Sequence, residues 1–367
     1  MGPAVNDPAV SAPWVVGLDD PAAADTAAVG GKGAGLHRLV ALGGRVPAGF
    51  VVSTAAFAAA LGEGVDFEAS LRELGPDAPL DVLEQAAGRA RATLVDASRS
   101  RPVLDAVREA YAARVGADTR VAVRSSAVGE DAAGASFAGE HDTYLELRGP
   151  DAVADAVARC WASLYTARAI SYRQRAAVGG GAGAMAVVVQ EMVPARAAGV
   201  FMTLNPANGD RSTVVCEAVW GLGEPLVSGE VTPDRFVIDK ISGEVVRREI
   251  AVKTTRLTRT EDGPGTVVAD VAPDDRERPC LDDAELAALL AVARRVERDA
   301  GVPQDGEFAV ADPGGPDAVH LLQTRPETVW SARAPRSAAP APGVGSALSA
   351  VLATLTRSAR EDADHGG

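Results

Sequence analysis

The stretch Gln304-Asp-Gly-Glu-Phe-Ala-Val-Ala-Asp312, Pro-Gly-Gly-Pro-Asp317, Ala-Val-His-Leu-Leu-Gln-Thr-Arg-Pro-Glu-Thr328 decides how this chain can fold. Two runs that alternate between polar and apolar residues flank a segment made mostly of proline and glycine. Alternating runs around such a segment predict a β-hairpin.

A hairpin centred on Gly315 brings polar side chains of both strands together on one face. Successive side chains alternate between faces, so every second residue of each strand lies on the same side as Glu307. Carboxylate and amide oxygens are ligands that Mg²⁺ accepts beside nucleotide phosphates, and a guanidinium suits phosphate oxygens. The alternative is an edge hairpin with one solvated polar face, which is common in antiparallel sheets. The predicted pairs are Asp312 with Ala318, Glu307 with Gln323, and Asp305 with Arg325.

The composition indicates a globular protein with two domains or one large domain of two lobes. The 367 residues carry a net charge of −14, which argues against nucleic acid as a partner because phosphate backbones are bound by basic surfaces. Three of the 36 basic residues are lysines, so Lys32 stands out in its glycine-rich context. The scattered cysteines and the lack of a signal peptide or membrane-spanning run lead us to expect a cytoplasmic protein.

The order of motifs along the chain predicts four segments. We expect a disordered lead-in over residues 1–13, an N-terminal lobe over 14–190, a C-terminal lobe over 191–330, and a linker and tail over 331–367. Within the lobes, the periodicity of apolar residues distinguishes helices from strands. It predicts helices within 55–115, 151–177 and 282–300, a buried strand over 186–190, and short strands over 199–255 with a hairpin near Gly243.

Three segments of the N-terminal half are candidates for phosphate binding. Gly30-Gly-Lys-Gly33 precedes an apolar helical stripe, and it either directs N–H groups and an ammonium at phosphate or is a structural glycine turn. Val121-Ala-Val-Arg124 is expected to be a strand that ends in a Ser-Ser turn. Ligands bind at strand ends in α/β sheets, unless the arginine simply reaches the surface. Gly129–Gly139 is typical of a mobile loop that covers phosphates, or of an ordinary surface loop.

Two further patterns allow both a functional and a structural interpretation. Val188-Val-Gln-Glu-Met-Val193 predicts a strand whose backbone amides can read an adenine edge, with Met192 on the ring, or which is plain core. Glu217 and Glu224 lie in a run rich in glycine and glutamate. They either help to hold metal or substrate, or they orient a turn.

Six motifs occur together in one order: Gly30-Gly-Lys-Gly33, Val123-Arg-Ser-Ser-Ala127, Ala135-Ser-Phe-Ala-Gly139, Val189-Gln-Glu-Met-Val193, Gly221-Leu-Gly-Glu224 with Pro233-Asp234, and Leu322-Gln-Thr-Arg-Pro326. From about Val15 to Trp330 the chain resembles the N-terminal ATP-binding domain of phosphoenolpyruvate synthase, pyruvate phosphate dikinase and rifampicin phosphotransferase. The resemblance implies an α+β, two-lobed ATP-grasp-like fold with ATP in the cleft between the lobes.

The same resemblance implies roles at the phosphate end of the site. Lys32 and Arg124 would bind the ATP phosphates and stabilise charge during transfer, and Arg325 would contact phosphate. Glu307 and Gln323 would hold Mg²⁺. These assignments agree with the argument from the hairpin.

The resemblance also implies residues around the rest of the nucleotide. Gly139 and Thr143 would belong to the segment that covers the phosphates. The adenine side would be formed by Gln190, Glu191 and Val193. Between Asp305 and Glu307 this chain has a glycine, where the family often has a bulkier apolar residue.

The expected function is that of an ATP-dependent phosphotransferase of the dikinase type, with ATP and Mg²⁺ as cofactors. No Thr-Ser-His-like motif of the family's phosphohistidine domain is found, and His365 lies in a polar tail, so we expect a stand-alone ATP-binding part. A separate swivelling-domain protein would carry the histidine and pass the phosphoryl group to a small molecule. The alternatives are a kinase that acts directly on a small molecule and a non-catalytic ATP sensor. The acceptor stays open between pyruvate, a rifamycin-like product, a glucan and a partner protein.

Overall fold

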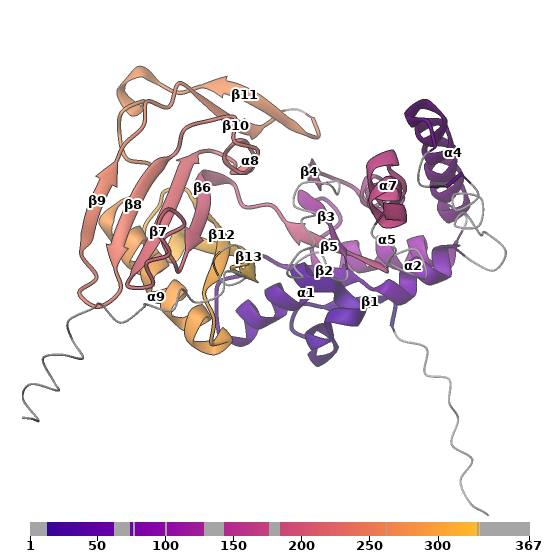
Figure 1. The fold of residues 1–367 in the computed structure, drawn as a ribbon, viewed down its shortest axis with the longest axis horizontal. Coiled ribbons are helices and arrows are strands. Elements are labelled where there is room, and N and C mark those ends of the chain that lie inside the picture. Colours follow the sequence, from indigo (N-terminus) through magenta and orange to yellow (C-terminus); the bar gives the residue numbers. More distant parts are fainter. Residues whose placement is uncertain are drawn as a thin grey trace, which may run out of the picture. The chain divides into compact units, whose positions relative to one another are not determined.

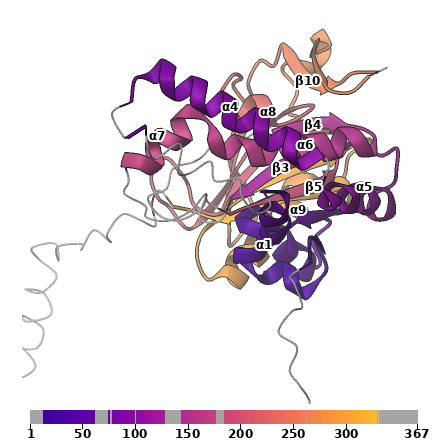
Figure 2. The ribbon, with the colours of Figure 1, turned by 90° about the vertical axis from the view of Figure 1, so that its right-hand side faces the viewer.

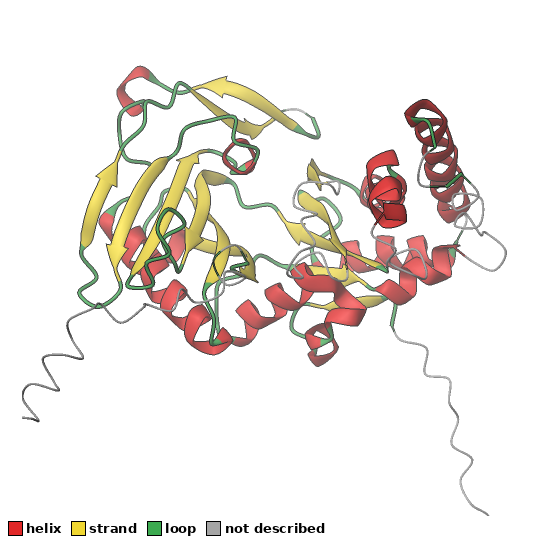
Figure 3. Cartoon of the chain, in the orientation of Figure 1, coloured by secondary structure: helices red, strands yellow, loops and turns green. Residues whose placement is uncertain are grey.

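The structure of this chain is a computed structural model, which describes residues 13–61, 74–75, 78–99, 101–127, 143–175, 184–261, 263–328 and 330. The described elements are helices and strands, and the strands form antiparallel sheets. Every described helix and strand lies in the first of two compact units, Met1–Thr328. The secondary structure confirms the expected α+β class (Figures 1 and 3). No helix among the described residues is long and apolar enough to cross a membrane.

The first sheet has five strands, and its middle strand contains the buried strand predicted over 186–190. Their order is β1 (Val15–Gly17), β2 (Gly49–Val52), β5 (Met185–Glu191), β3 (Val121–Ala127) and β4 (Thr143–Leu147). All neighbours are antiparallel. The expectation that β3 ends at Arg124 in a Ser-Ser turn is wrong, because the strand continues through both serines and pairs with β5 as far as Ala127.

Helices cover both faces of the first sheet. On one face α6 (Pro150–Ala162) packs between α4 (Leu80–Arg99) and α5 (Pro102–Arg114) (Figure 2). The helix α2 (Thr54–Leu61) contacts both α4 and α5. Their core includes Trp161 and Tyr111, which are fully buried. The helix α7 (Ala167–Arg175) follows α6. These elements confirm the helices predicted within 55–115 and 151–177, as far as those ranges are described.

The second sheet has six strands, also antiparallel. Their order is β13 (Val319–Pro326), β12 (Gln304–Ala311), β6 (Ala195–Met202), β7 (Thr213–Trp220), β8 (Asp234–Asp239) and β9 (Val245–Glu249). On one face lies α9 (Asp283–Ala300), which begins with a capping box at Asp282 and ends at Gly301 in the left-handed conformation. The predicted helix over 282–300 and the β8–β9 hairpin around Gly243 are confirmed.

Helix α1 (Thr26–Ala41) packs against both sheets. It contacts β5 and β3 of the first sheet and β13 of the second. Its buried leucines belong to one apolar cluster with Val188 of the first sheet and Phe308 of the second. A Cβ on Gly35 would lie 2.5 Å from the Thr324 carbonyl oxygen, so only glycine allows this close approach. Because α1 packs against both sheets, its residues have fixed positions relative to both of them.

A two-stranded hairpin makes a further link between the sheets. It consists of β10 (Thr255–Arg259) and β11 (Thr266–Asp270), and the Leu257 carbonyl of β10 accepts from the N–H of Leu222, which lies just after β7. At its tip, Arg120 donates to the Gly263 carbonyl at 2.9 Å, and the Gly265 N–H donates to the Glu146 carbonyl at 3.3 Å. The tip is thus held by residues adjoining or within the first sheet.

The Pro233-Asp234 motif has a structural explanation. Asp234 is fully buried and accepts hydrogen bonds from the N–H groups of Ala251 and Cys280. Lys253, also buried, donates to the same carboxylate at 2.5 Å. Through these contacts Asp234 connects the start of β8 with the segment before β10, which carries Ala251 and Lys253, and with the segment before α9, which carries Cys280.

We expect Lys253→Met to lower the free energy of unfolding by about 3–5 kcal/mol, because it leaves the Asp234 carboxylate buried without its cation. Urea denaturation monitored by far-UV circular dichroism measures this change. The control is Arg278→Met, which removes one partner of the exposed Arg278–Asp275 pair and is expected to change stability little. Equal losses in the two variants would contradict this interpretation of the motif.

Candidate functional site

The glycine motif forms a break inside a helix and not a loop before it. Helical structure begins at Thr26, where the Asp25 side chain accepts from the Ala27 N–H, and Gly30 interrupts it with φ 69° and ψ 175°. Positive φ at this position favours glycine. The Ser126 hydroxyl bonds to the chain on both sides of the break. Lys32 therefore lies in the first turn after the break, next to strand β3.

Arg124 reaches across from the first sheet to the second. It lies in the middle of β3, on the face against which α1 packs, and it donates to the Glu307 carboxylate on β12 at 2.5 Å. Its side chain is 19% exposed. Arg124 reaches Glu307 because its side chain lies on the face of the sheet that α1 covers. It does not lie at the end of a strand, as the sequence suggested.

The hairpin β12–β13 has the predicted register where the polar residues lie. Asp305 pairs with Arg325 and Glu307 with Gln323, which confirms that these four share one face. Directly after Glu307 a β-bulge shifts the register by one, and the ladder continues only to Val310 and Val319. The predicted pairing of Asp312 with Ala318 is therefore wrong: the two residues belong to the turn.

The glycine between the two acids also has a reason in the packing. A Cβ on Gly306 would lie 2.2 Å from the ring of Phe201, which is fully buried on the neighbouring strand β6. The phenylalanine ring thus occupies the space that a bulkier residue would need. The opposite face of the strand remains free for Asp305 and Glu307.

The charges of three cations act on the Glu307 carboxylate, and one of them, Arg124, is in contact with it. Burial by itself would raise the pKa of this group, but the ion pair and hydrogen bond with Arg124, together with the charges of Lys32 and Arg325, hold the pKa below its ordinary value. The cations come from a helix and from two strands of different sheets. Glu307 is thus ionised and lies where positive charge is concentrated.

Asp305 is in a different electrostatic environment from Glu307. Burial and the nearby charge of Glu327 raise the pKa of Asp305 to about 6, although Arg325, at 3.9 Å, acts in the opposite direction. The two carboxylates of one strand face therefore differ in their tendency to stay ionised at neutral pH.

Two buried carboxamide atoms at the site have no partner among the described residues: Gln323 Oε1 and Gln190 Nε2. Unpaired buried polar atoms are uncommon in folded proteins and indicate a missing ligand or water. Gln323 Oε1 lies opposite the Glu307 carboxylate, and an amide oxygen with a carboxylate fits Mg²⁺ that is completed by phosphate oxygens and water. Gln190 shares a face of the first sheet with Arg124, since it pairs with Ala122 and Arg124 pairs with Val188.

The remaining predicted residues lie around this arrangement. Thr143, the first residue of β4, is exposed and pairs directly with Arg124. Glu191 ends β5, and its N–H donates to the Ala48 carbonyl, while the Met192 N–H donates to the Arg120 carbonyl. Of the three amides from Glu191 to Val193, only that of Val193 has no partner in the described part of the chain. Gly139, like the rest of 129–139, lies outside the described residues.

An apolar surface continues from Glu307 along the same face of the second sheet. Ala309 follows on β12, Ala198 pairs with it on β6, and Val193 and Leu322 pack against both. The bulge in β13 is what turns Leu322 towards these alanines. Sequence reasoning missed this surface, although the spacing of Ala309 two residues after Glu307 places it on the same face.

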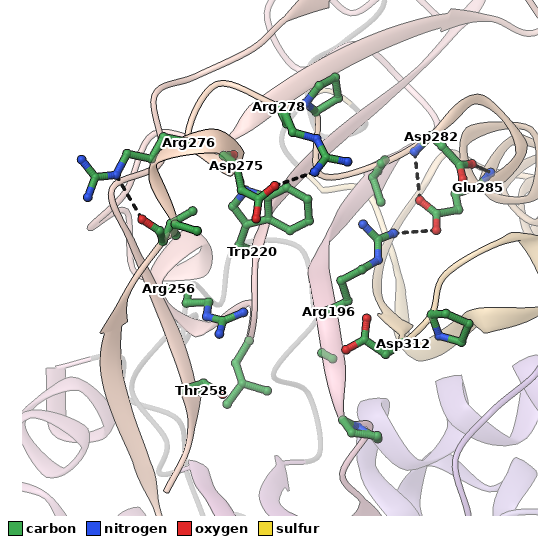
Figure 4. A pocket seen from close by; sticks show the side chains of 18 of the residues that line it. Arg196, Trp220, Arg256, Thr258, Asp275, Arg276, Arg278, Asp282, Glu285 and Asp312 are labelled. Carbon is green, nitrogen blue, oxygen red and sulfur yellow. Dashed lines mark hydrogen bonds and ion pairs between the residues drawn. The ribbon is translucent and has the colours of Figure 1, made fainter. Parts of the chain in front are cut away.

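The hairpin side of the site opens into a pocket of about 230 Å³ lined by Asp305, Glu307, Gln323 and Arg325 together with Val200 and Leu226. A larger cavity, of about 1270 Å³, lies between β6 and the β10–β11 hairpin (Figure 4). Its arginines largely bond to neighbouring groups: Arg196 to Glu285 at 2.6 Å and Arg278 to Asp275 at 2.6 Å. We place the candidate site at the hairpin, where the buried Gln323 Oε1 has no partner among the described residues and lies opposite an ionised carboxylate on which three cations act.

We expect the pH dependence of stability to change in Asp305→Asn. Because the folded-state pKa lies above the ordinary 3.8, protonation of Asp305 favours the folded state. This contribution is complete below pH 4 and is lost as the pH rises through about 6. Without Mg²⁺, the variant should be more stable than the wild type at pH 8, and this advantage should disappear near pH 4.

Urea denaturation at pH 4, 6 and 8 measures the difference between variant and wild type. The control is Asp317→Asn, an exposed carboxylate in the turn of the same hairpin. Parallel pH profiles of wild type and Asp305→Asn would show that the carboxyl does not titrate as stated.

Known proteins are similar in sequence to most of this chain. Residues 26–341 match the family described as "Pyruvate phosphate dikinase, AMP/ATP-binding domain". A rifampicin phosphotransferase of Streptomyces sviceus is 39% identical over 318 residues, which cover 86% of this chain and 36% of that protein. A probable phosphoenolpyruvate synthase of Methanothermobacter thermautotrophicus is 39% identical over 313 residues, covering 83% and 44%. The chain thus spans less than half the length of these relatives, and it belongs to the pyruvate phosphate dikinase AMP/ATP-binding domain family.

Proposed function

We propose that this protein binds Mg-ATP at the hairpin site and passes a phosphoryl group towards a histidine of a swivelling domain on a separate protein, as an ATP-dependent phosphotransferase of the dikinase type. From the histidine the group would reach a small-molecule acceptor. The relatives named phosphoenolpyruvate synthase and rifampicin phosphotransferase support this reaction class. The three cysteines are buried and none of them forms a disulfide, which is in keeping with the cytoplasmic location that we propose.

The observation that carries the proposal is that Arg124 bonds to the Glu307 carboxylate while the charges of Lys32 and Arg325 also act on it and help to lower its pKa. In a protein with a net charge of −14, such a concentration of cations is a specific feature of the site. Nucleotide phosphates need cations of this kind, and a guanidinium binds phosphate oxygens with two parallel hydrogen bonds. Phosphoryl transfer depends mainly on positioning and on stabilising charge, which these three side chains can supply.

Glu307 and Gln323 would hold the magnesium ion. The ionised carboxylate and the unpartnered Gln323 Oε1 lie opposite one another on neighbouring strands, so the donor set fits a hard cation. Bound there, Mg²⁺ would neutralise charge on the phosphates. Arg124, which donates to Glu307 in this structure, would contact phosphate as well, and Thr143 beside it would lie at the covering segment with Gly139.

The apolar surface next to Glu307 would receive the adenine ring. Ala198 and Ala309 are small enough to leave room for a flat ring, with Leu322 and Val193 at its sides. The Val193 N–H and Gln190 Nε2 are donors without partners in the described part of the chain. The Glu191 carbonyl would supply the acceptor beside them. Donors and acceptors in this order suit the edge of a purine.

We further propose that residues 14–190 and 191–330 are the two lobes that enclose the nucleotide. The strands of the first sheet end at Glu191 and those of the second begin at Ala195, so the division falls in the short connection between β5 and β6. The expected linker and tail, 331–367, lie outside the described residues.

We expect Lys32→Ala or Arg325→Ala to lower nucleotide turnover by at least 10²–10³-fold, because each removes a cation that stabilises charge in transfer. Turnover is measured as nucleotide product with Mg²⁺ present, and circular dichroism checks the fold. Arg38→Ala is the matched control: it lies on the same helix as Lys32 and pairs with Asp299 of α9, not with a residue of the hairpin strands. Wild-type turnover in both site variants would overturn the assignment.

Product analysis decides how the phosphoryl group leaves. The protein is incubated with ATP and Mg²⁺, with and without the histidine-bearing swivelling domain of a phosphoenolpyruvate synthase. AMP and phosphate that appear only with that domain are the expected result. ADP with a phosphorylated small molecule and no carrier would establish a direct kinase. Tight ATP binding without turnover in either mixture would favour a sensor and overturn the enzymatic proposal.

A further inference from the structure

We propose that Ser126 is a positioning residue of the nucleotide site. Its buried hydroxyl bonds to both sides of the break in α1 and thereby fixes the position of Lys32 relative to Arg124. The hydroxyl donates to the Val29 carbonyl at 2.9 Å and accepts from the Gly33 N–H at 3.3 Å. Val29 precedes the break at Gly30 and Gly33 follows it. One side chain of the first sheet therefore bonds to both sides of the break.

The chemistry of the break explains why a hydroxyl is needed there. A helix that is interrupted leaves carbonyl and N–H groups without their usual partners, and burial makes such groups costly. Serine supplies a donor and an acceptor on a single atom. Ser126 is completely buried, so water does not reach the pair of hydrogen bonds easily. A Cβ on Gly30 would lie 2.3 Å from the hydroxyl oxygen and 2.1 Å from the Ser126 carbonyl, which shows how closely the two segments approach.

The two hydrogen bonds of the Ser126 hydroxyl connect the segments that carry Lys32 and Arg124, the two residues that would bind phosphate. Ser126 and Arg124 are two residues apart on β3, so they share a face and their Cα atoms are about 7 Å apart. Lys32 lies between Gly30 and Gly33, within the segment that the hydroxyl holds. The separation of the ammonium from the guanidinium is thus defined through Ser126, and not through Ser125, whose side chain points to the opposite face of the strand.

Nucleotide binding tests this inference, which rests on the proposed function. Isothermal titration calorimetry measures the affinities of Mg-ATP and of adenosine, which lacks the phosphates. We expect Ser126→Ala to weaken Mg-ATP binding on the order of tenfold, the effect of losing one or two hydrogen bonds, while adenosine binding stays unchanged. Ser125→Ala, a change of the same size on the other face, should bind both as the wild type does.

A double-mutant cycle separates positioning from a purely structural role. If Ser126 acts through Lys32, then Ser126→Ala in a Lys32→Met background should not weaken Mg-ATP binding further. An equal additional loss in that background, or an equal loss for adenosine, would overturn the inference. So would wild-type affinity of Ser126→Ala for Mg-ATP.

The outcomes also distinguish the inference from the proposed function. If the wild type does not bind Mg-ATP, or if Lys32→Met binds it as tightly as the wild type, the proposed function itself fails. If Ser126→Ala does not fold, Ser126→Cys replaces it, since a thiol fills the space but forms weaker hydrogen bonds. The cysteine variant should show the same selective loss for Mg-ATP, and equal binding to wild type would overturn the inference.

Discussion

The packing of α1 against both sheets is the constraint on which the rest of this structure depends. Its leucines enter one apolar cluster that includes Val188 of the first sheet and Phe308 of the second, and its glycines allow the backbone to approach β3 and β13 closely. Interiors pack densely, so a helix held on two sides has little freedom to shift. Each charged group at the site is positioned relative to this helix.

The electrostatic arrangement follows from that packing. Glu307 is brought into contact with Arg124 of the other sheet and near Lys32 of α1, and their charges outweigh the cost of its burial. The arginines of the large cavity at the β10–β11 hairpin, in contrast, mostly bond to acids and carbonyls within it. At the hairpin, three cations act on one ionised carboxylate beside a buried carboxamide oxygen without a partner among the described residues, and this combination indicates a ligand site.

The hydroxyl of Ser126 and the tip of the β10–β11 hairpin show how distant segments stabilise the site without belonging to it. Ser126 joins the strand that carries Arg124 to the helix that carries Lys32. Arg120 and Glu146, adjoining and within the first sheet, hold the hairpin tip of the second part of the chain. Glu146 adopts a positive φ of 57° to do so, an uncommon conformation for a residue with a side chain. Both links join residues more than ninety positions apart in sequence.

The sequence by itself determined what depends on neighbours along the chain. Alternation with period two placed Glu307 opposite Gln323, and local capping signals placed α9 between Asp282 and Gly301. The tertiary structure alone decided the bulge after Glu307, the continuation of β3 through Ser125 and Ser126, and the alanine surface of β6 and β12. The reason is physical: periodicity and capping act within a few residues, whereas Arg124 meets Glu307 across 183 positions, and such contacts exist only once the sheets have packed.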